Sequence, residues 1–232
     1  MKVPRYFAAP MLLSAMPAAA AETVDTLTYT VEHQLWGKIG TLRREIRKSD
    51  KGISVSTDIA IHVSLLGATL RDTHGHWEEV WRDGRLQRFD AKTMSDGKSE
   101  IVHGEPEGGA FLIRSGEMRS TAPVSVHPVN PWSLKFVDAS VVMSPETGRV
   151  FPAVISDKGI ETKSVAGETW RLHHYVMDAD GEHHLYFDAL GTLVCLEFSD
   201  LTGKATVSLN GGLAKPSAAV AALASGTNAG AR

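Results

Sequence analysis

Residues 53–65 of this chain read ISVSTDIAIHVSL, and apolar and polar side chains alternate along almost the whole stretch. One face carries the apolar residues Ile53, Val55, Ile59, Ile61, Val63 and Leu65. The other face carries the polar residues Ser54, Ser56, Asp58, His62 and Ser64. Successive side chains of a β-strand point to opposite faces, so this period predicts a long antiparallel strand with one face in water.

The same alternation is present closer to the N-terminus. Polar side chains there alternate with four apolar residues, Leu27, Tyr29, Val31 and Leu35. The sequence WGKIG at residues 36–40 then predicts a glycine-containing turn that leads into a further strand over residues 41–47. These segments extend the predicted antiparallel sheet on the N-terminal side of residues 53–65.

A hairpin is predicted in the segment WEEVWRDGRLQRF, residues 77–89, which has an Asp-Gly pair at its centre. Asp-Gly between two strand-like arms is a strong hairpin signal, because both turn positions need positive φ. The register that follows sets Trp81 opposite Leu86 and Glu79 opposite Arg88.

Turn sequences punctuate the rest of the chain at intervals of roughly 8 to 14 residues, a spacing typical of a barrel or sandwich. They read SPETG, SDKG, VAGE, DADGE, DALG and DLTG. The best helix candidate is PWSLKFVDA, residues 131–139, with proline at its start. We therefore predict a mainly antiparallel all-β fold, shaped as a curved sheet, half-barrel or barrel, with at most one or two short helices.

The chain divides into three parts by composition. Residues 1–21 begin with Lys2 and Arg5, continue with an apolar centre and end in small residues, which is typical of a cleaved secretory signal. Cleavage near Ala20 or Ala21 would place the protein in the periplasm or outside the cell. Residues 22–210 form the predicted β domain, and the Ala/Gly/Ser-rich residues 211–232 are predicted to be a flexible tail. Within the domain, EIVHGEPEGG is predicted to be a loop because it is rich in Gly, Pro and Glu.

Charge and cysteine content restrict the partners. The chain has 24 Lys and Arg against 27 Asp and Glu, and no basic cluster is longer than Arg43-Arg44. This pattern argues against nucleic acid or an anionic lipid surface as a partner, and we also expect no membrane span. The single Cys195 excludes an internal disulfide, and its strand-like surroundings predict a buried, unreactive thiol.

Several motifs recur in an order that resembles a known family. They are a strand containing Tyr29 followed by GKIG, Trp77 and Trp81 with DGRL and DAKT…DG, then NPWSL, and finally YFDALGTLV. In these features, over residues 27–209, the chain resembles exported bacterial proteins grouped as a domain of unknown function, number 6134. Its opening and closing strands also look similar to the related family number 3108. The resemblance implies an exported, antiparallel β-rich protein and supplies no activity or catalytic residues.

The sequence contains no familiar catalytic motif, so histidines are the first candidates for chemistry. His74, His76 and Glu78 would share one face of an extended strand, where imidazole and carboxylate could bind copper or zinc. The alternative interpretation is that these are solvated side chains at a strand end. No other cofactor is predicted.

A second histidine group lies in LHHYVMDADGEHHLYF, residues 172–187. A turn centred on Ala179-Asp180 would set His174 opposite Leu185 and Tyr175 opposite His184. His174 and His183 would then lie on one apolar face, as metal ligands or as hydrogen-bonded residues at the rim of the core.

Aromatic and apolar side chains offer a third possibility, a ligand cavity in the concave side of the sheet. The candidate lining residues are Trp77, Trp81, Trp132, Trp170, Leu172 and Phe187. Ordinary core packing is the alternative. We expect a non-catalytic binding protein that holds an apolar or amphipathic small molecule, or a protein partner. A histidine-dependent copper or zinc protein and an enzyme without a recognisable motif remain as alternatives.

Overall fold

The computed structural model describes residues 22–200 and 202–210, and these residues are almost entirely β-structure. The first eight strands run in sequence as hairpins: β1 (Thr23–His33), β2 (Gly37–Ser49), β3 (Gly52–Leu65), β4 (Ala68–Arg82), β5 (Arg85–Ser95), β6 (Lys98–Glu107), β7 (Ala110–Ser115) and β8 (Met118–Ala122). The last five are β12 (Val154–Val165), β13 (Glu168–Asp178), β14 (Glu182–Phe187), β15 (Leu193–Asp200) and β16 (Gly203–Leu209).

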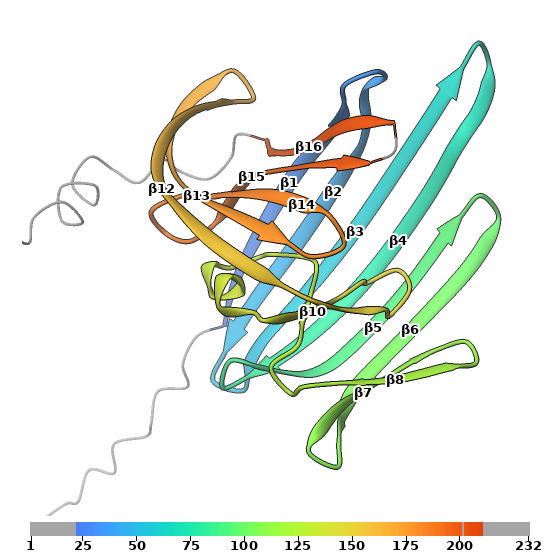
Figure 1. Cartoon of the computed structure of the whole chain (residues 1–232), viewed down its shortest axis with the longest axis vertical. Coiled ribbons are helices and arrows are strands. Elements are labelled where there is room, and N and C mark those ends of the chain that lie inside the picture. Colours follow the sequence, from blue (N-terminus) through green and yellow to red (C-terminus); the bar gives the residue numbers. More distant parts are fainter. Residues whose placement is uncertain (1–21, 201, 211–232) are drawn as a thin grey trace, which may run out of the picture.

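These thirteen strands form one antiparallel sheet in the order β12-β13-β14-β15-β16-β1-β2-β3-β4-β5-β6-β7-β8. The sheet curves strongly but does not close, since β8 and β12 are its two edges (Figure 1). The N-terminal and C-terminal halves of the chain meet where β1 pairs with β16. The prediction of an antiparallel all-β fold is therefore confirmed, as an open curved sheet.

Residues 123–153, which we call the inner segment, connect β8 to β12 across the concave side of the sheet (Figure 1). This segment has a small sheet of its own, with strands β9 (His127–Pro128), β10 (Val141–Met143) and β11 (Val150–Pro152). It also contains the 3₁₀ turn η1 (Leu134–Asp138), where the sequence predicted its best helix. The Ser133 side chain accepts a hydrogen bond from the Lys135 backbone N–H at the start of this turn.

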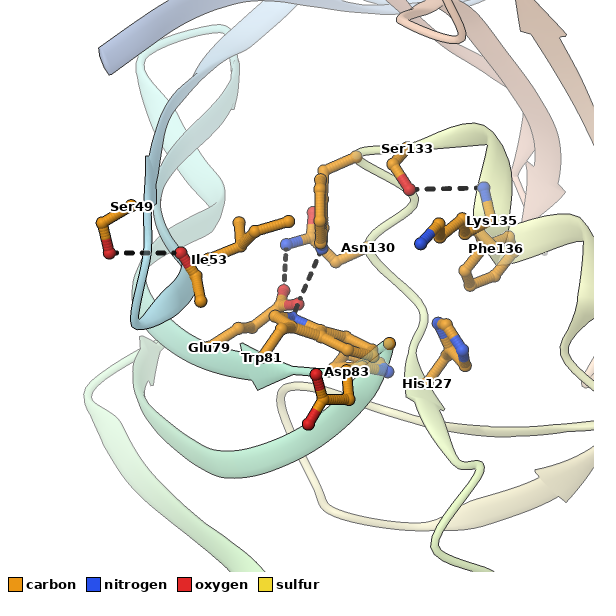
Figure 2. A pocket seen from close by; sticks show the side chains of 14 residues that line it. Ser49, Ile53, Glu79, Trp81, Asp83, His127, Asn130, Ser133, Lys135 and Phe136 are labelled. Carbon is orange, nitrogen blue, oxygen red and sulfur yellow. Dashed lines mark hydrogen bonds between the residues drawn. The ribbon is translucent and has the colours of Figure 1, made fainter. Parts of the chain in front are cut away.

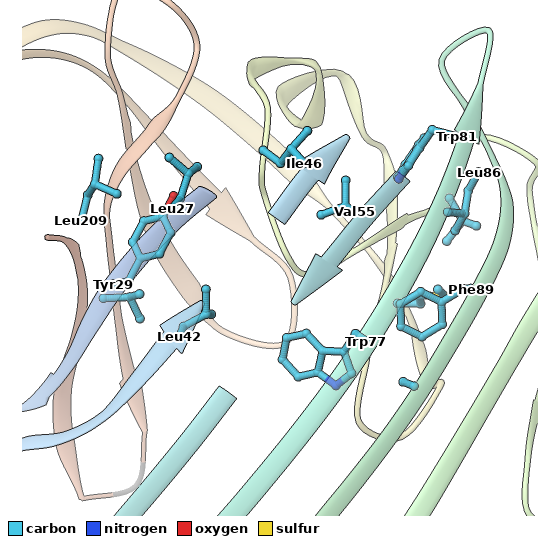
Figure 3. Close-up of a cluster of buried hydrophobic side chains, with 14 of the residues drawn as sticks. Leu27, Tyr29, Leu42, Ile46, Val55, Trp77, Trp81, Leu86, Phe89 and Leu209 are labelled. Atoms are coloured by element: carbon cyan, nitrogen blue, oxygen red, sulfur yellow. The ribbon is translucent and has the colours of Figure 1, made fainter. Parts of the chain in front are cut away.

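The inner segment completes two hydrophobic cores. In the larger, Val126 and Met143 belong to a cluster with residues of β1 to β8 and of β12 to β16, among them Tyr29, Trp77 and Phe89 (Figure 3). The second core joins the inner segment to β13, β14 and β15, with members that include Phe136, Val142, Tyr175, Met177, Leu185 and Phe187. The concave side is thus largely filled, and the remaining space lies beside the inner segment.

The alternation of residues 53–65 is confirmed as β3, which pairs with β2 on one side and β4 on the other. The first strand is also present, but it ends at His33, and Leu35 lies 65% exposed in the following turn. The next strand begins at Gly37, so all four residues of the GKIG sequence belong to β2 rather than to the turn.

The loop predicted for EIVHGEPEGG is wrong, because most of this segment is strand β6. Pro106 lies beyond the pairing between β5 and β6, which ends at Gly104, and is opposite Phe111 in the pairing between β6 and β7. The N–H that proline lacks therefore leaves no ladder bond unmade on the β5 side. The turn is confined to Gly108 and Gly109, both of which have positive φ.

The Asp-Gly hairpin is confirmed, with φ of 51° at Asp83 and 73° at Gly84. Trp81 pairs with Leu86 as predicted. A register shift between Val80 and Trp81 then moves the pairing by one residue, so Glu79 lies opposite Phe89 and not opposite Arg88.

The register predicted for the β13–β14 hairpin is wrong by one residue. His174 pairs with Tyr186 and Tyr175 pairs with Leu185. The chain turns over three residues rather than two, with positive φ at Asp180 and Gly181. Since a slip of one residue exchanges the faces of a strand, His174 and His183 lie on opposite faces instead of sharing one.

The predicted signal at residues 1–21 and the predicted tail at 211–232 lie outside the described residues. Among the residues that are described, no helix is long and apolar enough to cross a membrane.

Candidate functional site

Two adjoining cavities open beside the inner segment at the concave side of the sheet. The first has a volume of about 300 Å³ and the second of about 540 Å³. Ile53, Trp132, Ser133 and Lys135 line both of them, so the indole of Trp132 lies at the boundary between the two. We call the pair the Trp132 groove.

Glu79 lies at the base of the first cavity, where three N–H groups converge on its carboxylate (Figure 2). Asn130 Nδ2 donates to Oε1 at 2.8 Å. The indole N–H groups of Trp81 and Trp132 donate to Oε2 at 2.8 and 3.0 Å. The side chain is almost inaccessible, at 1% exposure, and this burial raises the pKa of Glu79 while the hydrogen bonds from Asn130 and Trp81 oppose the shift.

Arg44 extends this polar cluster beneath the inner segment. It is 2% exposed, its Nη2 donates to Asn130 Oδ1, and its Nη1 donates to the Pro131 carbonyl at 3.2 Å. The guanidinium carbon also lies 5.5 Å from the centre of the Tyr29 ring. Asn130 therefore links a buried cation on β2 with a buried carboxylate on β4, and it also donates to Thr57 on β3 at 3.1 Å. We call Arg44, Thr57, Glu79 and Asn130 the buried polar cluster.

His127 forms part of the wall of the first cavity (Figure 2). Its ring lies 4.7 Å from Trp81 and 5.9 Å from Phe136, measured between ring centres. Desolvation in this aromatic setting lowers the pKa of His127 to about 4, although Asp138 acts in the opposite direction. The imidazole is therefore neutral at physiological pH and adds little charge to the cavity.

Sequence reasoning missed the buried polar cluster, although the signal was present. Glu79 occupies an inward position of β4 between Trp77 and Trp81. Arg44 likewise stands between Leu42 and Ile46 on the inward face of β2. A charged residue in the apolar register of a strand requires a buried partner, and two such residues in neighbouring hairpins point to one shared site.

The six residues proposed to line a ligand cavity are only partly brought together. Trp81 and Trp132 line the first cavity, and Trp132 and Trp170 line the second. Trp77 lines a separate space of about 130 Å³ on the other side of Asn130. Leu172 and Phe187 are wholly buried in different cores and line none of these three cavities.

The candidate metal ligands of β4 are extended as predicted, with His74, His76 and Glu78 all exposed on one face. Each histidine has a carboxylate neighbour. His76 Nδ1 lies 2.7 Å from Asp58 Oδ1, and His74 Nε2 lies 3.5 Å from Asp72 Oδ1. The hydrogen bond with Asp58 raises the pKa of His76. These contacts describe ion pairs on an open sheet surface.

The histidines of the β13–β14 hairpin form a pair different from the predicted one. His174 Nε2 lies 3.0 Å from His184 Nδ1, and the His174 ring stacks on the rings of both His184 and Tyr186. His183 lies on the other face, near Phe198. Within residues 22–200 and 202–210 no three His, Cys, Asp or Glu side chains are arranged to hold a metal ion. Copper or zinc binding stays a prediction from the sequence.

Cys195 is 1% exposed, and desolvation raises the pKa of its thiol to about 12. The thiol is therefore protonated and shielded, as the sequence predicted.

Comparison with known proteins relates this architecture to a protein family. The family model described as Domain of unknown function (DUF6134) matches residues 29–210. The chain belongs to this family. The match covers the second part of β1, every later strand of the large sheet and the whole inner segment. It includes the buried polar cluster and all of the Trp132 groove except Asp25 and Leu27.

A solved structure supports the same fold for this DUF6134 chain. It is a beta-barrel-like protein of domain of unknown function DUF1849 from Brucella abortus, with a TM-score of 0.61 and 10% sequence identity. The alignment covers 80% of this chain and 94% of the other. At this identity the likeness concerns the fold alone. No curated protein matches the chain.

Proposed function

We propose that this protein is a non-catalytic binding protein of an exported compartment, and that it holds an apolar or amphipathic small molecule in the Trp132 groove. The observation that carries the proposal is the lining of the groove. Large apolar side chains from the sheet and from the inner segment meet there, including Ile53, Trp81, Trp132 and Phe136. Binding sites for small molecules are typically concave and mostly apolar, with a few placed polar groups.

The second cavity adds the features that suit an amphipathic ligand. Its apolar part comprises Leu27, Ile46, Trp170 and Leu190 among others. Its lining carries two cations, Lys48 and the exposed Lys135, together with the carboxylates of Asp25 and Asp188. Lys48 Nζ lies 3.1 Å from Asp25 Oδ2, a distance typical of an exposed ion pair that an anionic head group could replace at little cost.

The buried polar cluster supports binding rather than catalysis. The Glu79 carboxylate already accepts three hydrogen bonds from the protein, and the indole donors hold it at the base of the cavity. A general acid or base must reach the proton that it transfers, and this carboxylate is engaged and shielded. Glu79 is better suited to fixing the orientation of Trp81 and Trp132, which form the walls of the groove.

A fluorescent naphthylamine dye tests this proposal. We expect the parent protein to bind the dye with a rise in fluorescence. Leu190→Glu and Ile53→Asn should weaken binding at least about fivefold, because each places a polar group against the apolar lining. Ile160→Asn is the control, since Ile160 on β12 is 58% exposed, close to the 63% of Leu190, and lies outside both cavities.

Circular dichroism of each variant checks that it remains folded. Absence of dye binding by the folded parent would contradict the proposal. Equal losses in Leu190→Glu and Ile160→Asn would also contradict it, because the dye would then bind elsewhere. Native mass spectrometry of protein purified from its own compartment would identify a ligand that it retains.

A further inference from the structure

The β3–β4 hairpin projects beyond its neighbours at one end of the sheet (Figure 1). Pairing between β2 and β3 ends at Gly40 and Ile61. Pairing between β4 and β5 begins only at Thr73 and Ser95. Residues 62–72 are thus paired with one another and with no other strand, and at about 3.3 Å per residue the four positions after Ile61 reach roughly 13 Å further.

The tip of this hairpin is apolar and exposed. Leu65, Leu66 and Leu70 are 53%, 101% and 51% exposed. Leu66 thus has no protein atoms covering it, and it is the most exposed of the large apolar side chains in the described part of the chain. Single exposed leucines are common, but three exposed leucines at the end of one projecting hairpin form a distinct apolar patch.

The turn residue itself is unusual for its conformation. Leu66 has a φ of 49° and is followed by Gly67 with a φ of 83°, the geometry of a two-residue hairpin turn. The other two-residue turns with this geometry in the described part of the chain have Asp83, Asp96, Gly108 and Ala166 at the equivalent position. Leucine is disfavoured there by the backbone and again by its exposure to water, so the fold alone gives no reason for it.

We propose that the β3–β4 tip docks the protein reversibly on a lipid surface by inserting these leucines among the acyl chains. An interfacial segment buries its apolar face about 5–10 Å deep at the boundary between head groups and acyl chains. The projecting length of the hairpin spans that depth. This inference does not depend on what the Trp132 groove binds.

The base of the hairpin fits the head-group layer. His62, Arg71 and Asp72 lie just behind the tip, and His62 Nδ1 is 3.3 Å from Asp72 Oδ1. These charges nearly balance, so we expect apolar insertion that does not require anionic lipid. The outer edges of residues 62–65 and 68–71 pair with no strand, so a protein that adds a strand there is the competing occupant. Strand addition uses backbone groups, whereas insertion into lipid uses the Leu66 side chain, so Leu66→Asp distinguishes the two. Three leucines give weak affinity, as suits transient docking.

Vesicle sedimentation of the full chain tests the inference. We expect the parent to partition onto phosphatidylcholine–phosphatidylethanolamine vesicles, and Leu66→Asp to weaken this partition at least about tenfold. Aspartate occupies this position in two of the equivalent turns, at Asp83 and Asp96, so the variant should unfold at the same temperature or higher, and a folding defect would not explain the loss. Ile160→Asn should partition like the parent.

Two further results would overturn the inference. Loss of vesicle binding at high salt would indicate adsorption by charge rather than insertion. Self-association in ultracentrifugation that Leu66→Asp abolishes, together with no vesicle binding by the parent, would assign the tip to a second copy of the chain. Equal partition of parent and Leu66→Asp would exclude the tip altogether.

Site-specific fluorescence gives an independent readout. Cys195 is buried, so an environment-sensitive thiol dye would label Leu66→Cys selectively in the folded protein. We expect its emission to shift to shorter wavelength when vesicles are added, and the same dye on Ile160→Cys to remain unchanged. An unchanged spectrum at residue 66 would contradict insertion.

Discussion

At the scale of single residues, the concave side of the sheet contains charges in positions that otherwise carry apolar side chains. Arg44 and Glu79 tolerate burial because the Asn130 side chain bonds to both and the indoles of Trp81 and Trp132 satisfy the carboxylate. Removing one partner from such a cluster costs more than the cluster contributes, because the remaining charge stays buried. These residues position the walls of the groove.

The neutral state of His127 gives a prediction about acid stability. In the folded chain its pKa lies at about 4, below the ordinary value of 6.5. As pH falls below about 6.5 the unfolded chain binds a proton that the folded chain refuses, so stability decreases until pH reaches about 4. The full effect of this group is about 3 kcal/mol at most. His127→Gln should remove that decrease, as measured by urea unfolding at a series of pH values.

The control for this measurement is Ile160→Asn, at a site on β12 that is 58% exposed and does not titrate. It should retain the pH profile of the parent. An identical slope for the parent and His127→Gln between pH 4 and 6.5 would contradict the assignment of a buried neutral imidazole at residue 127.

At the scale of the elements, the turns determine the registers, and the Asp-Gly turn of the β4–β5 hairpin allows a direct test. Gly84 has a φ of 73°, and a side chain there would meet no atom within 4 Å. The cost of Gly84→Val is therefore backbone strain alone, about 1–3 kcal/mol, measured by urea unfolding. Gly84→Asn should cost less than half as much, since asparagine tolerates this conformation. Equal unfolding midpoints for the parent protein and Gly84→Val would contradict the turn assignment.

Sequence reasoning succeeded where a local pattern determines the structure. It failed where one additional residue in a turn changes the register of two strands. The period of two in residues 53–65 placed β3, and Asp83-Gly84 placed the β4–β5 turn. The β13–β14 turn gives the opposite case. Its third residue shifts every cross-strand pair by one, and this separates His174 from His183. The alternation of side chains alone contains no information on whether a turn has two residues or three.

Prediction of the candidate site from the sequence succeeded and failed in the same way. Two tryptophans on one strand indicated a concave aromatic surface, and Trp81 does line the groove. The contact between Glu79 and Asn130 joins residues 51 positions apart and depends on how the inner segment crosses the sheet. A single sequence contains no local signal for that crossing. The sequence did contain the two inward-facing charged residues, Arg44 and Glu79, to which Asn130 of the inner segment bonds.

At the scale of the whole molecule, the inner segment links two halves of an open sheet. Its small sheet pairs with no strand of the large one. It is instead attached through side chains, with Phe136 and Val142 packed against β13 and β14 and Asn130 bonded to residues of β2, β3 and β4. Because the large sheet does not close by strand pairing, these contacts connect β13 and β14 to β2, β3 and β4 across the concave side.

The consequence is that Asn130→Ala should release the inner segment before the large sheet unfolds. The substitution removes the hydrogen bonds to Thr57 and Glu79 and leaves Arg44 beside an empty space, a loss of about 2–4 kcal/mol. Lys135 and Arg149 lie in the inner segment, so trypsin should cut there at least about tenfold faster while the far-UV spectrum of the sheet persists.

The matched control is Asn210→Ala, which removes the bond from Thr30 Oγ1 at 2.7 Å to a half-buried side chain next to β1 and β16. It should leave the trypsin sites of the inner segment protected, because nothing in that contact touches residues 123–153. If Asn130→Ala were instead cut throughout the chain in step with loss of the far-UV signal, the inner segment and the sheet would unfold as one unit. The sheet would then need the inner segment in place to stay folded.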